Sequence, residues 1–283
     1  MIDFSTSTKV VPDSGRHTLG RRLLDVHAWL VYVFLYAPII ILVIFSFTQD
    51  GFGVRWTGFT LKWYQRLFDD DRMMAAALNT LWVALLATII STILGTLLAL
   101  AMERYRFRGR AGLDALLYLP IVIPEIVMAL ALLAFFSFSF GIVESLVGVK
   151  LRMNIWTVIF SHVAFCVSFV VVVVRASLKG FDSRLEEAAA DLGADPTTTF
   201  WRVTLPLIMP GVIGGALLAF TLSLDDFIIS FFTIGPGTNL LPIEVYGRVK
   251  RAITPQINAI STLMLLLSML LVFLSQFVQR RSA

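Results

Sequence analysis

The chain has few charged residues and almost no cysteine. Only 15% of its 283 residues are charged, whereas about a quarter are charged in an ordinary soluble domain. Its single cysteine, Cys166, lies in an apolar run, so a disulfide framework within the chain is excluded. Hydrophobic residues make up 58% of the chain, and the mean hydropathy is +0.84. This composition predicts an integral membrane protein whose surface mostly faces lipid.

The sequence lacks the motifs that several functions would require. The sequence has no G-x-x-x-x-G-K-[ST] phosphate loop, so we expect no ATP hydrolysis by this chain alone. It also has no Ser/His/Asp arrangement, which argues against a membrane enzyme. His162 and Cys166 share a helix face, but a pair without further ligands is a weak metal signal. We therefore expect a hydrogen-bonded His162 and no metal site. The basic residues form no single stripe, so no nucleic-acid partner is expected.

Long apolar runs take up most of the chain instead. Six of them are long enough to cross a bilayer, which takes about 20 residues of helix. Because lipid offers no partners to backbone N–H and C=O groups, each run should be helical, and alternating β-barrel patterning is absent. The predicted fold is all-α, with spans near 29–47, 76–102, 113–138, 155–174, 207–234 and 257–278.

The distribution of Lys and Arg predicts that both termini are cytoplasmic. Fourteen of the 23 basic residues fall in the N-terminal tail, the second and fourth loops and the C-terminus, and nine fall on the other side. The short second loop is the most informative, because it packs four arginines between residues 104 and 110. We expect a cytoplasmic tail over residues 1–26 and one transmembrane domain over residues 27–283. The first span should be an uncleaved anchor rather than a signal peptide.

A polar stretch separates the fourth and fifth predicted spans. Residues 186–195 favour a helix with acidic residues in its first turn, and Gly193 offers a place to turn. Pro196 suits the first position of a second short helix, and Pro206 should mark re-entry into the membrane. From these residues alone, the stretch is either a helix-turn-helix that docks a partner or an amphipathic connection on lipid headgroups.

The same stretch contains a recognisable set of residues: Glu187, Ala188, Ala189, Gly193, Ala194, Leu205, Pro206 and Pro210. In their identity and spacing they resemble the EAA loop of ABC-importer permeases. The resemblance implies a type I (MetI-like) fold, with a coupling loop at about residues 182–210 that docks on a dimer of separate ATPase subunits. Those partners would bind ATP and Mg, and this chain would need no cofactor.

Three carboxylates lie inside predicted spans. Asp225 and Asp226 fall in the fifth span, and Glu125 follows Pro124 near mid-depth in the third. Each charge in hydrocarbon costs on the order of 2.5–3.5 kcal/mol, so each needs a reason. Adjacent residues point about 100° apart on a helix, so one aspartate can line a pathway while the other pairs within the bundle or caps a helix break.

These carboxylates favour a pathway for a cationic solute. Nearby aromatic side chains such as Phe231 and Tyr246 could add cation–π contacts. The alternative is internal pairing of the carboxylates with a basic group or with Ser and Thr hydroxyls, although the spans offer almost no Lys or Arg.

Further motifs run from about residue 30 to the end and include FTLKWY at 59–64, YRFRG at 105–109, SHVAFC at 161–166, TLSLDD at 221–226 and PQINA at 255–259. They make the chain similar to the second permease subunit of spermidine/putrescine importers. This resemblance implies half of a polyamine pathway in a bacterial inner membrane. The implied partners are a homologous permease, an ATPase dimer and an extracytoplasmic polyamine-binding protein. Where this chain has Glu125, the family often has Asp.

Two rival functions remain open at this point. In the first, the same machinery imports another small solute, such as an opine, thiamine or ferric iron. In the second, the chain is a secondary transporter or channel that needs no ATPase, and residues 186–211 are a surface helix.

Overall fold

The computed structural model describes residues 16–51, 55–182, 184–252 and 254–280. Six of the described helices are long and apolar enough to cross a membrane, which confirms the expected number. An isolated antiparallel bridge joins Thr48 to Phe59. In chain order the elements are α1 (Arg16–Phe45), α2 (Lys62–Phe68), α3 (Asp71–Arg104), α4 (Arg110–Val122), α5 (Glu125–Val147), α6 (Ile155–Lys179), α7 (Arg184–Asp191), α8 (Pro196–Thr199), the π-helical segment η1 (Phe200–Thr204), α9 (Leu205–Asp225), α10 (Ile228–Thr233), α11 (Leu241–Val249) and α12 (Pro255–Arg280).

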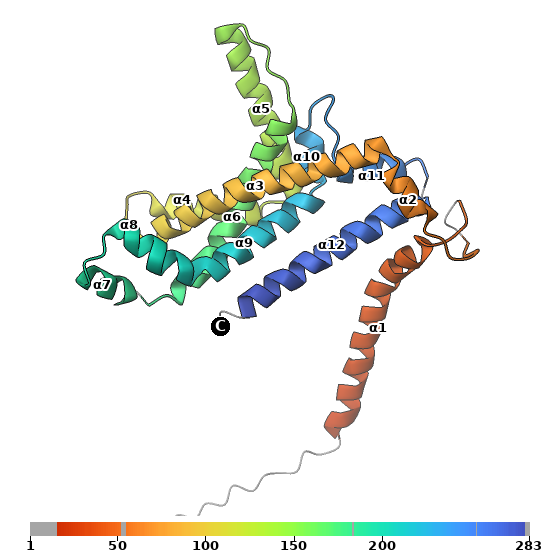
Figure 1. Ribbon diagram of the computed structural model, residues 1–283, viewed down its shortest axis with the longest axis horizontal. Coiled ribbons are helices and arrows are strands. Elements are labelled where there is room, and N and C mark those ends of the chain that lie inside the picture. Colours follow the sequence, from red (N-terminus) through yellow and green to blue (C-terminus); the bar gives the residue numbers. More distant parts are fainter. Residues whose placement is uncertain (1–15, 52–54, 183, 253, 281–283) are drawn as a thin grey trace, which may run out of the picture.

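Helices α3, α6 and α9 pack along one another and form the core (Figure 1). Small residues let their backbones approach closely, as is usual for membrane helices. A Cβ atom added to Gly95 of α3 would lie 2.7 Å from the Cβ atom of Val170 on α6. A Cβ atom added to Gly211 of α9 would overlap the hydroxyl group of Ser177 on α6. These contacts fix the three helices against one another.

Two of the spans leave this core. Figure 1 shows α5 rising steeply from the layer of α3, α6 and α9, and α1 running away from the other helices. None of the residues described from Gly20 to Phe45 is buried, and α5 buries only Ala129 and Phe136. The apolar surfaces of α1 and α5 are therefore left for lipid or for another subunit. Of the expected tail over residues 1–26, residues 1–15 lie outside the described residues, and the rest are helical.

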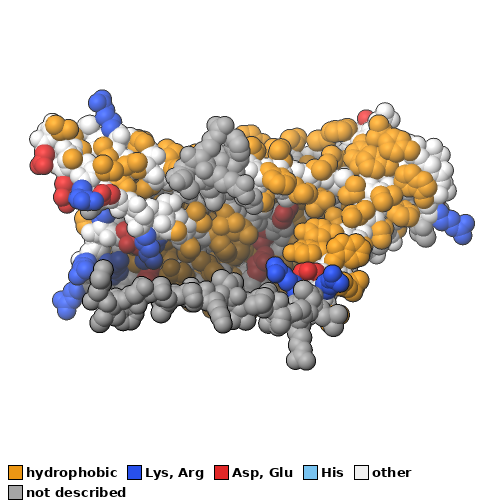
Figure 2. Space-filling model, turned by 90° about the horizontal axis from the view of Figure 1, so that it is seen from below, with side chains coloured by type: hydrophobic (Ala, Val, Ile, Leu, Met, Phe, Trp, Pro, Cys, Tyr) orange, Lys and Arg blue, Asp and Glu red, His pale blue; other side chains and the backbone are white. Residues whose placement is uncertain are grey.

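The loops gather at two ends of the molecule. Helices α7 and α8 lie at one end and α2 and α11 at the other (Figure 1). At the first end, Arg104 forms an ion pair with Glu186, so the second and fourth loops lie together, as expected from the charges. At the other end, Arg248 Nη1 donates to Asp70 Oδ2 over 2.6 Å. Figure 2 shows hydrophobic side chains over much of one face, with Lys and Arg side chains at both ends and a further group near the lower edge.

The third span differs from the expected helix over residues 113–138. The helix breaks at Pro124, α4 ends at Val122, and the spanning helix is α5. A proline restricts the residue before it to extended conformations, and Ile123 has ψ 138°. Glu125 therefore lies in the first turn of a helix rather than in the middle of one.

The fifth span also differs from the expected helix over residues 207–234. Pro206 does not begin a separate helix, because helical structure runs unbroken from Pro196 through η1 and α9 to Asp225. Pro206 is the second residue of α9, which follows the π-helical segment η1 directly. The chain then breaks at Asp226 and Phe227 before α10 begins.

Candidate functional site

The break between α9 and α10 is stabilised by Asp226. Its Oδ1 atom accepts a hydrogen bond from the backbone N–H group of Ser230 over 2.8 Å. This contact satisfies a donor in the first turn of α10, which would otherwise be unpaired in an apolar environment. The alternative that one aspartate caps a helix break is therefore confirmed for Asp226.

A buried histidine holds this aspartate in place. His162 Nε2 lies 3.4 Å from Asp226 Oδ1 and 3.0 Å from the hydroxyl oxygen of Ser230. Its other ring nitrogen, Nδ1, lies 2.6 Å from the hydroxyl oxygen of Ser223. The expected hydrogen-bonded His162 is confirmed, and its contact with Asp226 bears out the alternative of internal pairing with a basic group, although this particular partner was not foreseen. The sequence placed one on the fourth span and the other on the fifth, with no local pattern to join them.

Glu125 lies beside Asp226. The two carboxyl groups interact where the start of α5 packs against α10. Asp226 is only 6% exposed, and its Oδ2 atom has no hydrogen-bond partner among the described residues. An acidic side chain at the start of α5 therefore lies next to the Asp226–His162 pair, in a part of the bundle that also contains Ser223 and Ser230.

Asp225 is directed to a different part of the structure. It is exposed, and its Oδ2 atom accepts a hydrogen bond from Ser268 of α12 over 3.2 Å. The structure therefore brings Glu125 and Asp226 together and leaves Asp225 apart from them. This separation follows from the divergence of neighbouring side chains on a helix.

Aromatic side chains form a cluster next to these carboxylates. The ring of Phe227 lies 5.5 Å from that of Phe231 and 4.6 Å from that of Tyr246, measured between centroids. Both Phe231 and Tyr246 are exposed. The ammonium group of Lys250 lies 4.6 Å from the centroid of the Tyr246 ring. The cluster therefore presents faces that attract cations, and one of them already holds a primary ammonium group.

The polar segment at residues 182–210 contains the expected turn. Gly193 ends α7 with a positive φ of 86°. The Gly193 N–H group donates to the Ala190 carbonyl over 2.9 Å, and the Ala194 N–H group donates to the Ala189 carbonyl over 3.0 Å. These two bonds form a Schellman motif, in which glycine is favoured because it tolerates the left-handed conformation.

Most of the other residues expected to couple to a partner lie at the surface. Glu187 and Ala188 are exposed, and Ala189 is half-buried. At the start of α9, Leu205 is half-buried and Pro206 is exposed. Leu192, which precedes the turn, is 90% exposed, an unusual state for a leucine outside the apolar spans.

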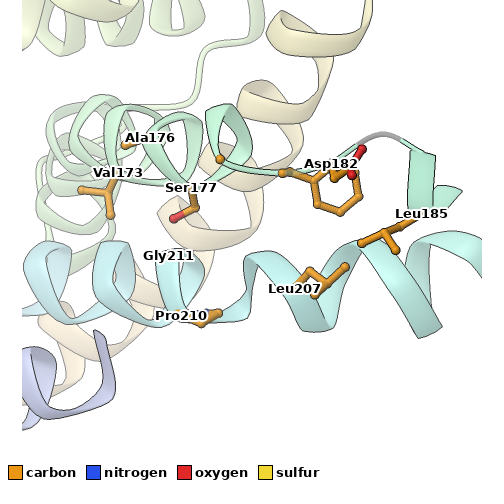
Figure 3. Close-up of a pocket in the computed structure, with 10 residues that line it drawn as sticks. Val173, Ala176, Ser177, Asp182, Leu185, Leu207, Pro210 and Gly211 are labelled. Atoms are coloured by element: carbon orange, nitrogen blue, oxygen red, sulfur yellow. The ribbon is translucent and has the colours of Figure 1, made fainter. Parts of the chain in front are cut away.

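A cavity of about 620 Å³ lies between the end of α6, the start of α7 and the start of α9. In Figure 3, Leu185 of α7 and Leu207 of α9 border this cavity, and Ser177 of α6 points toward α9. Helix α7 is therefore not packed tightly onto the spans.

An ion-pair network at the opposite end was also missed from the sequence. Arg248 of α11 bonds to Asp70, which caps α3, and to Glu244 over 2.8 Å. The hydrogen bond from Arg248 lowers the pKa of Asp70 below its usual value. These groups lie next to a second cavity, of about 320 Å³. The network ties α11 to α3 beside the aromatic cluster.

Comparisons with known proteins agree with this architecture. The chain is 42% identical over 254 residues to the spermidine/putrescine transport system permease protein PotC of Haemophilus influenzae, covering 90% of this chain and 95% of that protein. It is 41% identical over 235 residues to the putrescine transport system permease protein PotI of Escherichia coli strain K12, covering 83% and 82%. A crystal structure of a bacterial ABC transporter involved in alginate import shares the fold, with a TM-score of 0.73, 20% identity and coverage of 93% and 95%.

The family comparison covers more than half of the chain. Residues 91–283 match the family described as the inner membrane component of binding-protein-dependent transport systems. The described residues also provide six helices that can cross a membrane. The chain therefore belongs to this family of multi-pass inner-membrane transport proteins.

Proposed function

We propose that this chain is a permease subunit of an ATP-driven importer and forms half of the transmembrane pathway for a polyamine such as spermidine or putrescine. The similarity to PotC and PotI supports this cargo. The structural observation that carries the proposal is the position of Glu125 in the first turn of α5, which packs against α10, where the buried Asp226 accepts a hydrogen bond from the Ser230 N–H group.

The chemistry of a polyamine matches this region. Polyamines are flexible chains of methylene groups that carry ammonium groups at intervals. The Asp226 Oδ2 atom and the Glu125 carboxyl group can accept hydrogen bonds from one ammonium group, and the faces of Phe231 and Tyr246 can bind the next. The contact between Lys250 and Tyr246 is the same interaction made within the chain. Asp225 would form a separate contact in the pathway, near α12.

The 182–210 segment would dock on the ATPase dimer. Exposed Glu187 would pair with a basic group of the ATPase, and exposed Leu192 would enter an apolar groove. ATP and Mg would bind to that partner, and this chain would hold no cofactor. A homologous permease would cover the apolar surfaces of α1 and α5, and an extracytoplasmic binding protein would deliver the cargo at the end formed by α2 and α11.

The cargo proposal is tested by uptake kinetics in proteoliposomes that contain the full complex. Glu125→Gln and Asp226→Asn keep the side-chain shape but remove one charge each. We expect each to raise the KM for spermidine about ten-fold or more, because a charged hydrogen bond contributes about 1.5–3 kcal/mol. Arg108→Gln, an exposed substitution in the loop between α3 and α4, is the control. If Glu125→Gln and Asp226→Asn both take up spermidine with the wild-type KM, these carboxylates do not bind the cargo.

A further inference from the structure

Helix α7 has little apolar contact with the membrane-spanning helices. None of the described residues of α7 is buried, and α7 packs mainly against α8 and η1. The cavity of about 620 Å³ separates Leu185 of α7 from the ends of α6 and α9. Hydrocarbon packing therefore cannot be the main route by which a movement of α7 reaches the spans.

A polar cluster joins α7 to two other elements. The Oε1 atom of Glu186 accepts hydrogen bonds from Arg104 Nη2 and from the hydroxyl group of Thr204. Arg104 Nη2 also donates to the Thr204 hydroxyl oxygen over 3.2 Å. Each of the three side chains thus contacts the other two. We call this set, Glu186, Arg104 and Thr204, the polar clamp.

The position of each member makes the clamp a mechanical junction. Arg104 is the last residue of α3, and Thr204 is the last residue of η1, directly before α9. Thr204 is fully buried, so its hydroxyl group has no water as an alternative partner. π-Helical segments are rare and occur often at functional sites. The clamp therefore joins α7 to the ends of two core helices at an irregular turn.

The end of α3 is itself tied to the rest of the bundle. Glu103, next to Arg104, accepts a hydrogen bond from Arg175 Nε of α6 over 2.7 Å. Arg175 also donates to Asp114 of α4 over 2.5 Å. A force on Arg104 is therefore shared with α4 and α6 as well as with α9.

The two adjacent glutamates of α7 have different surroundings. Glu186 is half-buried in the clamp, whereas Glu187 is exposed. Neighbouring residues point about 100° apart on a helix, so the two side chains cannot face the same partner. Glu187 is free to meet a partner, and Glu186 faces the chain's own helices.

We propose that the polar clamp transmits the movement of the 182–210 segment to α3 and α9, with Glu186 and Arg104 as positioning residues that touch neither cargo nor ATP. This inference rests on the proposed docking of the segment on an ATPase. Without the clamp, the ATPase subunits would still bind and hydrolyse ATP. Their movement would shift the loosely packed α7 without being transmitted to α3 and α9.

The experiment compares variants of the full complex in proteoliposomes. Three quantities are measured: retention of the ATPase subunits, the rate of ATP hydrolysis, and spermidine imported per ATP hydrolysed. Glu186→Ala should retain the ATPase and its hydrolysis, while spermidine imported per ATP falls about ten-fold, as expected for loss of a charged hydrogen bond. Arg108→Gln, an exposed substitution in the loop between α3 and α4 and outside the docking segment, should match the wild type in all three.

Charge exchange separates a positioning role from a merely structural one. Arg104→Glu alone should fail in the same way as Glu186→Ala, and the double variant Arg104→Glu/Glu186→Arg should regain much of the import per ATP. Rescue requires a folded protein, so it also answers the concern that the single variants misfold. If Glu186→Ala keeps the wild-type import per ATP, or loses the ATPase subunits, or if the double variant shows no rescue, the clamp proposal is wrong.

The proposed function has its own separate readout in the same experiment. Glu187→Lys should release the ATPase subunits. If that variant retains them and imports spermidine normally, docking through this segment is wrong. If Glu187→Lys releases them while Glu186→Ala behaves as the wild type, docking stands and only the clamp fails.

Discussion

Gly193 is the position at which a substitution should weaken ATPase docking through backbone conformation alone. Its φ of 86° lies in the left-handed region, and an added Cβ atom would meet no atom within 4 Å. A residue other than glycine costs about 1–2 kcal/mol in this conformation. If the Schellman turn sets the orientation of the docking segment, Gly193→Ala should weaken binding of the ATPase subunits about five- to thirty-fold.

The assay is the affinity of the purified ATPase subunits for nanodiscs that contain the permease pair. Gly193→Leu should resemble Gly193→Ala, because the space around the Cβ position is open. Gly193→Asn should stay within about two-fold of the wild type, because Asn also adopts the left-handed conformation. Equal binding by the Ala variant and the wild type would refute the reasoning. A loss that grows with side-chain volume would also refute it, since steric contact with the partner would then be the cause.

Three further predictions concern stability and are measured by thermal unfolding in detergent. Asp226→Ala should destabilise the protein by about 1–3 kcal/mol because the Ser230 N–H group loses its acceptor. Asp226→Asn keeps an acceptor and should lose less stability, so an equal loss of stability in both variants would contradict this. The hydrogen bond from Arg248 lowers the pKa of Asp70, so the contribution of this ion pair to the free energy of unfolding is complete at neutral pH and is lost as the pH falls below about 4. An Asp70→Asn variant whose stability depends on acid pH as that of the wild type does would contradict this. Gly235→Ala should destabilise the protein severely, because the added Cβ atom would overlap the Met153 carbonyl. Gly141→Ala, on an open helix face, should not, and equal stability of the two variants would refute this.

Much of the fold followed from the apolar runs alone. Six spans and the common end of the second and fourth loops follow from run length and from Lys and Arg. The turn at Gly193 follows from local chemistry. The break at Pro124 had a local signal as well, because a proline disfavours helix at the residue before it. The expected span ignored this signal because the apolar run continues on both sides of Pro124.

The site was predictable in part. Adjacent aspartates on a helix must diverge, which anticipated the separate surroundings of Asp225 and Asp226. Their partners could not be predicted, because contacts between different spans depend on how the helices pack. His162 contacts Asp226 from another helix, and Arg104 contacts Glu186 although the two are 82 positions apart in the sequence. No local periodicity encodes such pairs.

The most direct test of the account is spermidine uptake by proteoliposomes that contain the purified complex. We expect uptake only when the ATPase subunits and hydrolysable ATP are present, with loss of uptake in Glu187→Lys. Uptake driven by a proton or sodium gradient through the permease without ATPase subunits would contradict the account.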